Sequence, residues 1–428
     1  KIMSGIVTSN VFRGSGVIAA AAGGLNWVST VVTASTLTAE AGNGYWINTT
    51  SNTCTITLPA SAERGDQIIF IDYARTWGTN KIILDSNGLN YQGDDDTLTV
   101  EYDTDGETLN IVYSDATKGW VPLNDEEVTD APVAPPTQKA IFAFGRSSGV
   151  SNIANLVNSS GVIASDTSGV GTARETLAAT AYGGDKAIMA YGTAGGVVSL
   201  SNLVNNSGAL AADVTGVGTA RASLAAAKYG TDKGIFGFGD NTSGNLNMTN
   251  LVNNSGVIAT DTTGVGTARA FPAGTGYGSS GQAIFGYGYP GANSSLTNLV
   301  SNVGVVATDT TGVGTARFSL AAAGYGGDKA IFAFGDIAGG PGKTAVSNLV
   351  SNTGVVAADV SGVGTARSYM PAASYGGDKA IFAFGTLGAP GKTGVSNLVS
   401  NTGVVASDTG AVGTARDNCG GAGYSTSA

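Results

Sequence analysis

Short apolar runs, each bounded by glycine or a small polar residue, recur at a regular spacing through the last two thirds of the chain. The first reads Ile-Phe-Ala-Phe-Gly from Ile141, and related runs begin at Ile188, Ile235, Ile284, Ile331 and Ile381. A Gly-Thr-Ala-Arg word follows each run and ends at Arg174, Arg221, Arg269, Arg317, Arg367 and Arg416. One unit of 47 to 50 residues therefore occurs six times. Runs this short predict β-strands, and a repeat of this length is typical of a four-stranded propeller blade.

Four strands are expected in each unit. In the copy that contains Ile331, they cover residues 320–325, 330–334, 348–351 and 354–357. A Gly-Gly-Asp-Lys turn joins the first two, because glycine and aspartate tolerate the left-handed conformations of tight turns. Alanines dominate the first strand, which suits the crowded axis of a propeller. The aromatic pair on the second strand is expected to fill the space between neighbouring sheets.

The order of these words resembles the kelch repeat. Each unit runs from its arginine through a small-residue strand to a motif such as Tyr-Gly-Gly-Asp-Lys-Ala-Ile-Phe-Ala-Phe-Gly at Tyr325, and the likeness covers residues 139–428. The units lack the second glycine of the kelch doublet, and Val-Val-Ala replaces the late kelch tryptophan. The array begins on a second strand at Lys139 and ends with a lone first strand after Arg416. The resemblance therefore implies a six-bladed kelch-like β-propeller closed by the C-terminal strand, without free edges.

The chain before residue 139 divides into three parts. Residues 1–40 are rich in small residues and are interpreted as an N-terminal anchoring and assembly segment. Residues 124–138 form an acidic, proline-rich linker. Residues 41–123 are predicted to be a small β-sandwich-like domain, with strands at 44–49, 53–58, 66–72, 81–85, 97–102 and 108–113 and with Trp46, Trp77 and Trp120 as core candidates. The predicted fold class of the whole chain is all-β.

Several words of the domain at 41–123 resemble the small β modules of bacteriophage tail fibres and related virion appendages. They are Gly44-Tyr-Trp-Ile-Asn-Thr-Thr50, Thr55-Ile-Thr-Leu-Pro-Ala-Ser61, Gly65-Asp66, Gly78-Thr-Asn80 and Lys118-Gly-Trp120. The resemblance implies a trimeric or otherwise repeated fibre that is attached by its N-terminal end and presents its C-terminal end outward. It assigns no role to a single residue.

Composition narrows the chemistry. The chain has 428 residues, of which only 12% are charged, with a net charge of −10 and no histidine. No basic patch exists that could neutralise nucleic-acid phosphates. A Ser-His-Asp triad and the histidine ligands of copper oxidases built on kelch-like propellers are excluded. No apolar segment is long enough for a membrane span. Cys54 and Cys419 lie in different modules and predict no disulfide, and no cofactor or metal is expected.

Every unit carries an aspartate eight residues before its arginine. A ring of arginines would suit an anionic ligand. Constant spacing in all copies favours a structural role instead, in which each pair braces its own inter-strand loop through charge-assisted hydrogen bonds. The predicted pairs are Asp166/Arg174, Asp213/Arg221, Asp261/Arg269, Asp309/Arg317, Asp359/Arg367 and Asp408/Arg416.

The stretch between the second and third strands varies in length and composition while its flanking words stay constant. We expect all six stretches to emerge on one face of the ring, where recognition residues of a rigid scaffold usually lie. The alternative is that unconstrained loops have simply diverged. The loops cover residues 146–151, 193–200, 240–248, 289–296, 336–346 and 386–395, and the candidate receptor-binding residues are Arg146, Thr193, Asp240, Asn241, Tyr289, Asp336, Lys343 and Lys392.

Three weaker motifs are interpreted without a ligand. The Gly-Gly-Asp-Lys words around Asp185, Asp328 and Asp378, with a variant around Asp232, are hairpin turns. Pro341-Gly-Lys-Thr344 and Pro390-Gly-Lys-Thr393 lack the earlier glycine of a phosphate-binding loop. Asp94-Asp95-Asp96 lacks the spacing of a calcium-binding loop. Glu175 is the only glutamate in the array, which disfavours a glycosidase without excluding one.

The leading hypothesis is a structural virion protein, a phage tail fibre or receptor-binding appendage whose propeller loops contact the host surface. Such a protein is assembled in the host cytoplasm and resides in the virion tail. Its expected partners are other tail or baseplate proteins, through residues 1–40, and a host-surface glycan or protein. A homo-oligomer is expected, with a trimer favoured, and neither nucleic-acid binding, membrane insertion nor enzymatic activity. The alternatives are a bacterial surface or secreted carbohydrate-binding adhesin or lectin, a decoration protein without a receptor role, and a glycan-cleaving enzyme.

Overall fold

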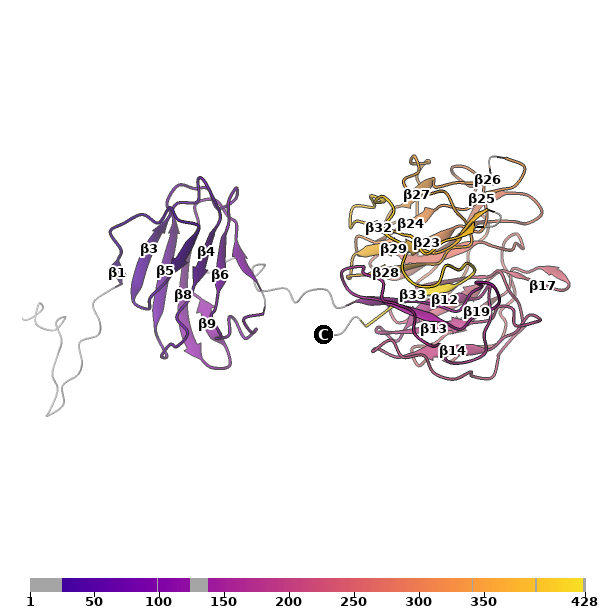
Figure 1. Cartoon of the computed structure of the whole chain (residues 1–428), viewed down its shortest axis with the longest axis horizontal. Coiled ribbons are helices and arrows are strands. Elements are labelled where there is room, and N and C mark those ends of the chain that lie inside the picture. Colours follow the sequence, from indigo (N-terminus) through magenta and orange to yellow (C-terminus); the bar gives the residue numbers. More distant parts are fainter. Residues whose placement is uncertain (1–24, 98, 124–137, 341, 389–390, 426–428) are drawn as a thin grey trace, which may run out of the picture. The chain divides into compact units, whose positions relative to one another are not determined.

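The computed structural model describes residues 25–97, 99–123, 138–340, 342–388 and 391–425, and these residues form an all-β protein without a helix (Figure 1). The predicted all-β class is confirmed. The chain divides into two compact units, Lys1–Pro135 and Pro136–Ala428. Residues 1–24 of the predicted anchoring segment and 124–137 of the predicted linker lie outside the described residues.

Two sheets make up the first unit. One sheet consists, in order, of β1 (Asn26–Trp27), β3 (Asn43–Ile47), β5 (Gln67–Asp72), β8 (Thr108–Asp115) and β9 (Gly119–Pro122). The other consists of β2 (Thr36–Thr38), β4 (Cys54–Thr57), β6 (Ile82–Asp85) and β7 (Val100–Tyr102). The first three strands of each sheet pair in parallel, and the rest pair antiparallel. The chain alternates between the two sheets from β1 to β6.

The two sheets of the first unit enclose one core, as expected of a sandwich. Alternating residues of each strand point inward, so that Tyr45 and Phe70 of one sheet and Ile56 of the other share a single buried cluster. Trp77 and Trp120 are fully buried, as predicted. Trp46 is only half-buried and stacks on the exposed Trp27, so its prediction as a core residue was wrong.

The six strands predicted in the first unit are all present, with ends that differ by a few residues, and three others were missed. Of these, β1 and β2 lie within the segment interpreted as an anchor, yet they pair with β3 and β4. Residues 26–38 therefore contribute strands to the first unit. These strands of two and three residues are too short to show the alternation of buried and exposed positions that identifies a strand in the sequence. They are held mainly by backbone pairing at the sheet edges and not by side-chain burial.

Besides three two-stranded hairpins, the described part of the second unit contains six three-stranded antiparallel sheets. Five are contiguous in sequence: β12–β13–β14 (Ala178–Tyr182, Lys186–Ala190, Ser201–Val204), β15–β16–β19 (Ala225–Tyr229, Lys233–Gly237, Thr249–Val252), β20–β21–β22 (Ala273–Tyr277, Gln282–Gly288, Ser294–Val300), β23–β24–β27 (Ala321–Tyr325, Lys329–Ala333, Ser347–Val350) and β28–β29–β32 (Ala372–Tyr375, Lys379–Ala383, Ser396–Val399). The sixth joins the two ends of the unit as β33–β10–β11 (Gly420–Tyr424, Lys139–Ala143, Ala154–Val157).

The fourth strand predicted for each unit is not formed, and this prediction was wrong. Residues 354–357 make a single bridge, between Val350 and Val356, and the next bridge joins Ser347 to Val360. Between these two bridges, β27 has two residues (348 and 349), whereas the segment that follows it has three (357–359). The extra residue interrupts the pairing as a β-bulge does. The pattern recurs in the first copy, where bridges join Val157 to Ile163 and Ala154 to Thr167.

The first strands of the six sheets are neighbours in a cyclic order. β12 lies beside β15, β15 beside β20, β20 beside β23, β23 beside β28, β28 beside β33, and β33 beside β12. The last link depends on β33 pairing with β10, in a register that runs from Lys139 opposite Tyr424 to Ala143 opposite Gly420. The predicted pairing of the C-terminal strand with the segment around Phe142 is therefore present.

Aromatic residues of the second strands fill the space between sheets, as predicted. Phe142 meets Phe384 of the preceding sheet with ring centroids 5.8 Å apart, and Tyr191 meets Phe236 at 5.4 Å. Equivalent edge-on or tilted contacts join Phe238 to Phe285, Tyr287 to Phe332, and Phe334 to Phe382. Because aromatic rings carry large apolar area and favour such angles, these contacts bind each sheet to the next.

Candidate functional site

Each repeat arginine is buried between two sheets. Arg174 lies over the ring of Phe144, 4.2 Å from its centroid, and its Nε donates a 2.9 Å hydrogen bond to the carbonyl of Tyr191 in the next sheet. The other five arginines lie 4.0 to 4.4 Å over the equivalent ring and bond the equivalent carbonyl. All six are 0% exposed. They join sheets by cation–π contact and are inaccessible to an anionic ligand.

Four arginines form an ion pair with the aspartate of the next predicted Asp/Arg pair and not with the aspartate eight residues before them, so the predicted pairing was wrong for Arg174, Arg269, Arg367 and Arg416. Asp213 lies 3.9 Å from Arg174 and accepts hydrogen bonds from the Thr172 backbone N–H and hydroxyl, at 3.0 and 2.6 Å. The Asn202 amide also donates to Asp213, at 2.9 Å. In a regular repeat, contacts within and between copies have equally constant spacing, so sequence alone does not separate them. The same threonine–aspartate clasp joins Thr219 to Asp261, Thr267 to Asp309, Thr315 to Asp359, Thr365 to Asp408 and Thr414 to Asp166.

Burial and hydrogen bonding act in opposite directions on the clasp carboxylates. Burial raises the pKa of Asp213, but the hydrogen bonds from Thr172 and Asn202 and the charge of Arg174 outweigh it and hold that pKa below its ordinary value. Burial lowers the pKa of Arg174 to about 10, with Asp213 opposing the shift. Both groups are therefore charged at neutral pH.

Six residues, each two positions after a repeat arginine, form a closed cycle of backbone hydrogen bonds, which we call the backbone ring. The N–H of each member donates to the carbonyl of the member before it, at 2.8 to 3.1 Å, in the order Thr176, Ser223, Phe271, Ser319, Tyr369, Asn418 and back to Thr176. All six have positive φ, between 51° and 56°. None is glycine, and left-handed residues of this kind cluster at functional sites.

The six variable loops surround the backbone ring. The first residue of each loop bridges the residue that follows a repeat arginine, as Thr193 bridges Glu175 and Asp336 bridges Phe318. The same bridge joins Arg146 to Asp417, Asp240 to Ala222, Tyr289 to Ala270 and Thr386 to Ser368. Neighbouring loops also touch: the Asn245 amide donates to the Tyr289 carbonyl, and the Asn293 amide to that of Ala338. We call the loops and the backbone ring together the loop face.

The candidate receptor-binding residues also stabilise the conformation of the loops through ion pairs, hydrogen bonds and hairpin pairing. Lys343 forms an ion pair with Asp336 inside the hairpin of β25 (Asp336–Ile337) and β26 (Gly342–Lys343). Lys392, in the hairpin of β30 (Thr386–Gly388) and β31 (Gly391–Lys392), lies 3.1 Å from Asp417 and bonds the Arg146 carbonyl. Asp240 and Asn241 form β17, which pairs with β18 (Gly244–Asn245). The two Pro-Gly-Lys-Thr words thus contribute to hairpins, apart from prolines 341 and 390, which lie outside the described residues.

Sequence reasoning missed an aromatic cluster on the loop face. The ring centroid of Phe271 lies 5.6 Å from that of Tyr369 and 6.0 Å from that of Phe318. The centroid of Phe318 lies 5.2 Å from that of Tyr289. Only Tyr289 had been singled out. The sequence could have indicated this cluster, because three of its residues depart from the repeat. Most copies have a small or polar residue at the positions of Phe271, Phe318 and Tyr369.

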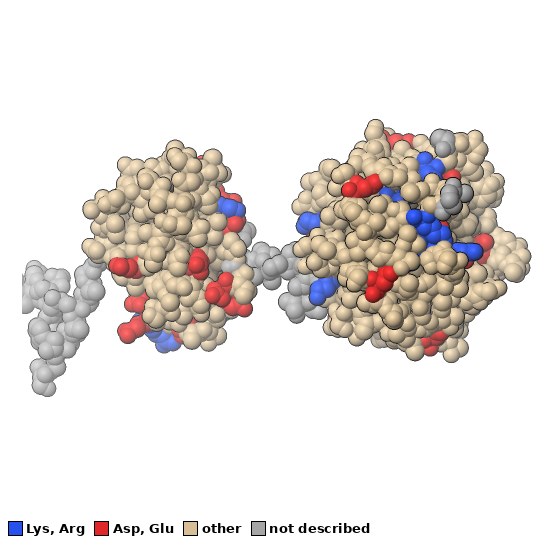
Figure 2. All heavy atoms as spheres, in the orientation of Figure 1, with Lys and Arg blue, Asp and Glu red and all other residues tan. Residues whose placement is uncertain are grey.

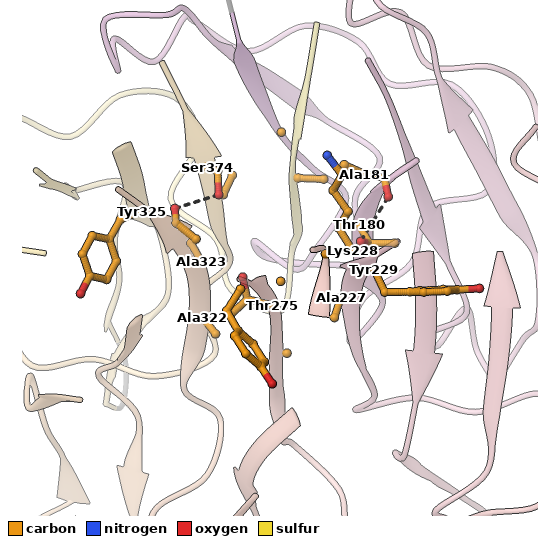
Figure 3. Close-up of a pocket in the computed structure, with 18 of the residues that line it drawn as sticks. Thr180, Ala181, Ala227, Lys228, Tyr229, Thr275, Ala322, Ala323, Tyr325 and Ser374 are labelled. Atoms are coloured by element: carbon orange, nitrogen blue, oxygen red, sulfur yellow. Dashed lines mark hydrogen bonds between the residues drawn. The ribbon is translucent and has the colours of Figure 1, made fainter. Parts of the chain in front are cut away.

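A cavity of about 360 Å³ lies at the opposite ends of the sheets, and residues of all six first strands line it (Figure 3). Lys228 of β15 lies there, where the other first strands have Ala181, Gly276, Gly324, Ser374 or Gly423. Burial lowers the pKa of Lys228, and Asp232 opposes the shift. The cavity therefore holds a partly desolvated ammonium group at a position where the other five first strands have small, uncharged residues.

The remaining candidate motifs have local partners. The turn aspartates Asp185, Asp232, Asp328 and Asp378 each pair with the lysine that follows them. Asp95 accepts hydrogen bonds from Thr97. Within the described ranges, no three His, Cys, Asp or Glu side chains are grouped to hold a metal ion. Cys54 and Cys419 are buried free thiols, and burial raises the pKa of each to about 11.

Comparison with known proteins gives no relative: no protein-family model matches the chain, and no curated protein is significantly similar to it. In the part of the chain that the structure describes, no helix is long and apolar enough to cross a membrane. On the faces in view, charged side chains are few and scattered over both units (Figure 2).

Proposed function

We propose that the second unit is a six-bladed kelch-like β-propeller closed by β33. Three observations support this. The first strands neighbour one another in a cycle and line one cavity. The clasp between Asp166 and Thr414 repeats the one found between consecutive copies, with the threonine hydroxyl donating at 2.5 Å. The backbone ring closes through Thr176 and Asn418. A ring of this kind has no free sheet edge at its seam.

We further propose that the chain is a virion protein, a phage tail fibre or receptor-binding appendage, and that its loop face contacts the host. The observation that carries this is the opposite placement of chain entry and loops within the second unit. Gln138, which leads into β10, bonds the turn at Gly376 and Gly377. The loops leave the second strands at their other ends. The chain thus enters the second unit at the end away from the loop face, and recognition on rigid scaffolds favours such loops.

The proposed assembly follows from the resemblance of residues 41–123 to the modules of phage tail fibres. The N-terminal part of the chain joins other tail or baseplate proteins, the protein is a homo-oligomer with a trimer favoured, and it functions in the virion tail after assembly in the host cytoplasm. The receptor is a surface glycan or protein of the host. No enzymatic step, nucleic-acid partner or membrane insertion is part of the proposal. The net charge of −10 is consistent with the lack of a nucleic-acid partner.

Immunogold labelling of the culture that encodes the chain tests the location. Label on the tails of virus particles is expected. Label on cell envelopes of a culture without particles would instead favour the bacterial adhesin or lectin.

Binding of the fluorescently labelled whole chain to a panel of bacterial strains tests the role. We expect binding to some strains, and loss of binding when the hairpins 336–343 and 386–392 are replaced by short Gly-Ser turns. Tail labelling with no binding to any strain that the virus infects would indicate a decoration protein. Replacement of the exposed turn 326–329 by another tight turn is the control and should leave binding unchanged.

A further inference from the structure

Three aromatic residues interrupt the repeat on one sector of the loop face. In the backbone ring, Phe271 and Tyr369 stand where the other copies have Thr176, Ser223, Ser319 and Asn418. Phe318 directly follows its arginine, where the other copies have Glu175, Ala222, Ala270, Ser368 and Asp417. Copies with serine or alanine there close the same hydrogen bonds and bridges. The scaffold therefore does not require aromatic side chains at these positions.

With Tyr289, these rings form one continuous surface, which we call the aromatic patch (Phe271, Tyr289, Phe318 and Tyr369). Neighbouring centroids lie 5.2 to 6.0 Å apart, and the planes meet at 57° to 89°. All four side chains are half-buried. The patch thus combines residues from three consecutive copies, and each ring is packed against its neighbours while part of it stays accessible. Rings held in this way lose little entropy when a ligand binds.

A buried hydroxyl adjoins the aromatic patch. Ser319 is 5% exposed, and its Oγ has no hydrogen-bond partner among the described residues. It lines a hollow of about 80 Å³ together with Phe271 and Tyr369. A buried hydroxyl without a partner is unfavourable, and such groups in native structures commonly await water or a ligand. The hollow therefore offers a hydrogen-bonding group at the edge of the aromatic surface.

The charges near the aromatic patch neutralise each other. Lys343 lies 5.7 Å from the centroid of Tyr369 and is paired with Asp336. A ligand with a net negative charge would therefore compete with Asp336 for this lysine. A ligand with an apolar face and a hydroxyl edge fits both features of the site.

We propose that the aromatic patch and Ser319 bind a neutral saccharide. A pyranose ring stacks its C–H face on one of the two rings, Phe271 or Tyr369, and packs its edge against the other, because the two ring planes meet at 89°. The negative face of an aromatic ring attracts polarised C–H groups. A sugar hydroxyl hydrogen-bonds the Ser319 Oγ. The inference rests on the proposed function, since it names the ligand class of the same loop face, but its test separates the two.

Phe271→Ser and Tyr369→Ser are the decisive variants, because serine already occupies the equivalent positions 223 and 319 and closes the ring there. Val305→Ser is the control, because this side chain is 64% exposed and lies outside the loop face. Thermal unfolding first establishes that the three variants fold like the wild type. Binding is then measured on an array of neutral oligosaccharides and on bacterial cells. We expect each aromatic variant to bind at least about tenfold more weakly, and the control to bind as the wild type does.

Treatment of the cells separates ligand class from receptor role. Loss of binding after periodate oxidation, but not after protease digestion, supports the saccharide. Binding that survives periodate and disappears after protease overturns this inference and leaves the receptor role intact. Unchanged binding by Phe271→Ser and Tyr369→Ser to both the array and the cells also overturns it. Binding to the array without binding to any cell overturns the receptor role alone.

Discussion

At the scale of single residues, the clasp between consecutive copies carries the charge chemistry of the second unit. Arg269 is packed over Phe238 at 4.0 Å, and its NH2 group donates to Asn298 at 2.7 Å. The Asn298 amide donates to Asp309 at 2.9 Å, and Asp309 accepts from Thr267. A buried cation is tolerated because neighbouring groups use its donors. One such clasp thus lies beside each of the six sheets of the second unit.

Asp309→Ala should lower the free energy of unfolding of the second unit by about 2 kcal/mol, because the Thr267 N–H, its hydroxyl and the Asn298 amide lose a charged acceptor. Chemical denaturation near pH 7 measures this. Asp328→Asn, in an exposed turn, is the control and should change stability far less. An equal loss in both variants would refute the clasp.

The effect of Asp309→Ala should also depend on pH. Burial raises the pKa of Asp309, but hydrogen bonds from Thr267 and Asn298 bring it below the ordinary 3.8. A carboxylate with a lowered folded pKa contributes stability above the unfolded pKa and loses it as pH falls further. The difference between wild type and variant should therefore shrink as pH drops below 3.8.

At the scale of elements, the sequence allowed most strands to be predicted and few of the contacts between them. Regular apolar runs such as that at Ile331 identified the first three strands of each unit, because burial on a pleated sheet imposes that pattern. The prediction of a fourth strand was wrong because one extra residue interrupts the pairing, and the hydrophobic pattern does not reveal such a bulge. The predicted partner of Arg174 was wrong because, in a repeat, Asp166 and Asp213 both lie at a constant distance in sequence from the arginine. The backbone ring could not be predicted from residue types, because it depends on the positive φ angles of six residues that are not glycine.

The first strand β15 gives a prediction at this scale. Lys228→Met should stabilise the second unit by about 1 kcal/mol near pH 7, because it keeps an apolar stem and removes an ammonium group that burial disfavours. Differential scanning calorimetry measures the change. Lys233→Met is the control: this lysine is paired with Asp232 at a turn, so no gain is expected.

The gain from Lys228→Met should fall at high pH. The unfolded lysine titrates near 10.5, and burial lowers the folded pKa. Between the two values the folded protein binds fewer protons than the unfolded chain, so wild-type stability rises with pH there. The advantage of the variant must then narrow. A gain that stays constant up to pH 10.5 would show that charge burial is not its cause.

At the scale of the whole molecule, the two units differ in how the chain holds them together. The first unit has one core between two sheets. The second has separate clusters, each between adjacent sheets, so every sheet depends on both of its neighbours. A linear array of such sheets would leave two faces uncovered, whereas a cycle covers all of them. The seam at β10 and β33 should therefore be as important as any junction within the array.

Gly421→Val tests the seam. A side chain at Gly421 would meet Phe142 and the Ala372 carbonyl at 2.8 Å, so valine should weaken the fit of β33. We expect the melting temperature of the second unit to fall by several degrees, with no change in the first unit. Labelling by a thiol reagent, located by mass spectrometry, should become faster at Cys419 than at Cys54, because Cys419 directly precedes β33 and is buried in the closed seam. Gly149→Ala, with open space around its Cα, is the control. If Gly421→Val melts and labels as this control does, the unit is not closed through β33.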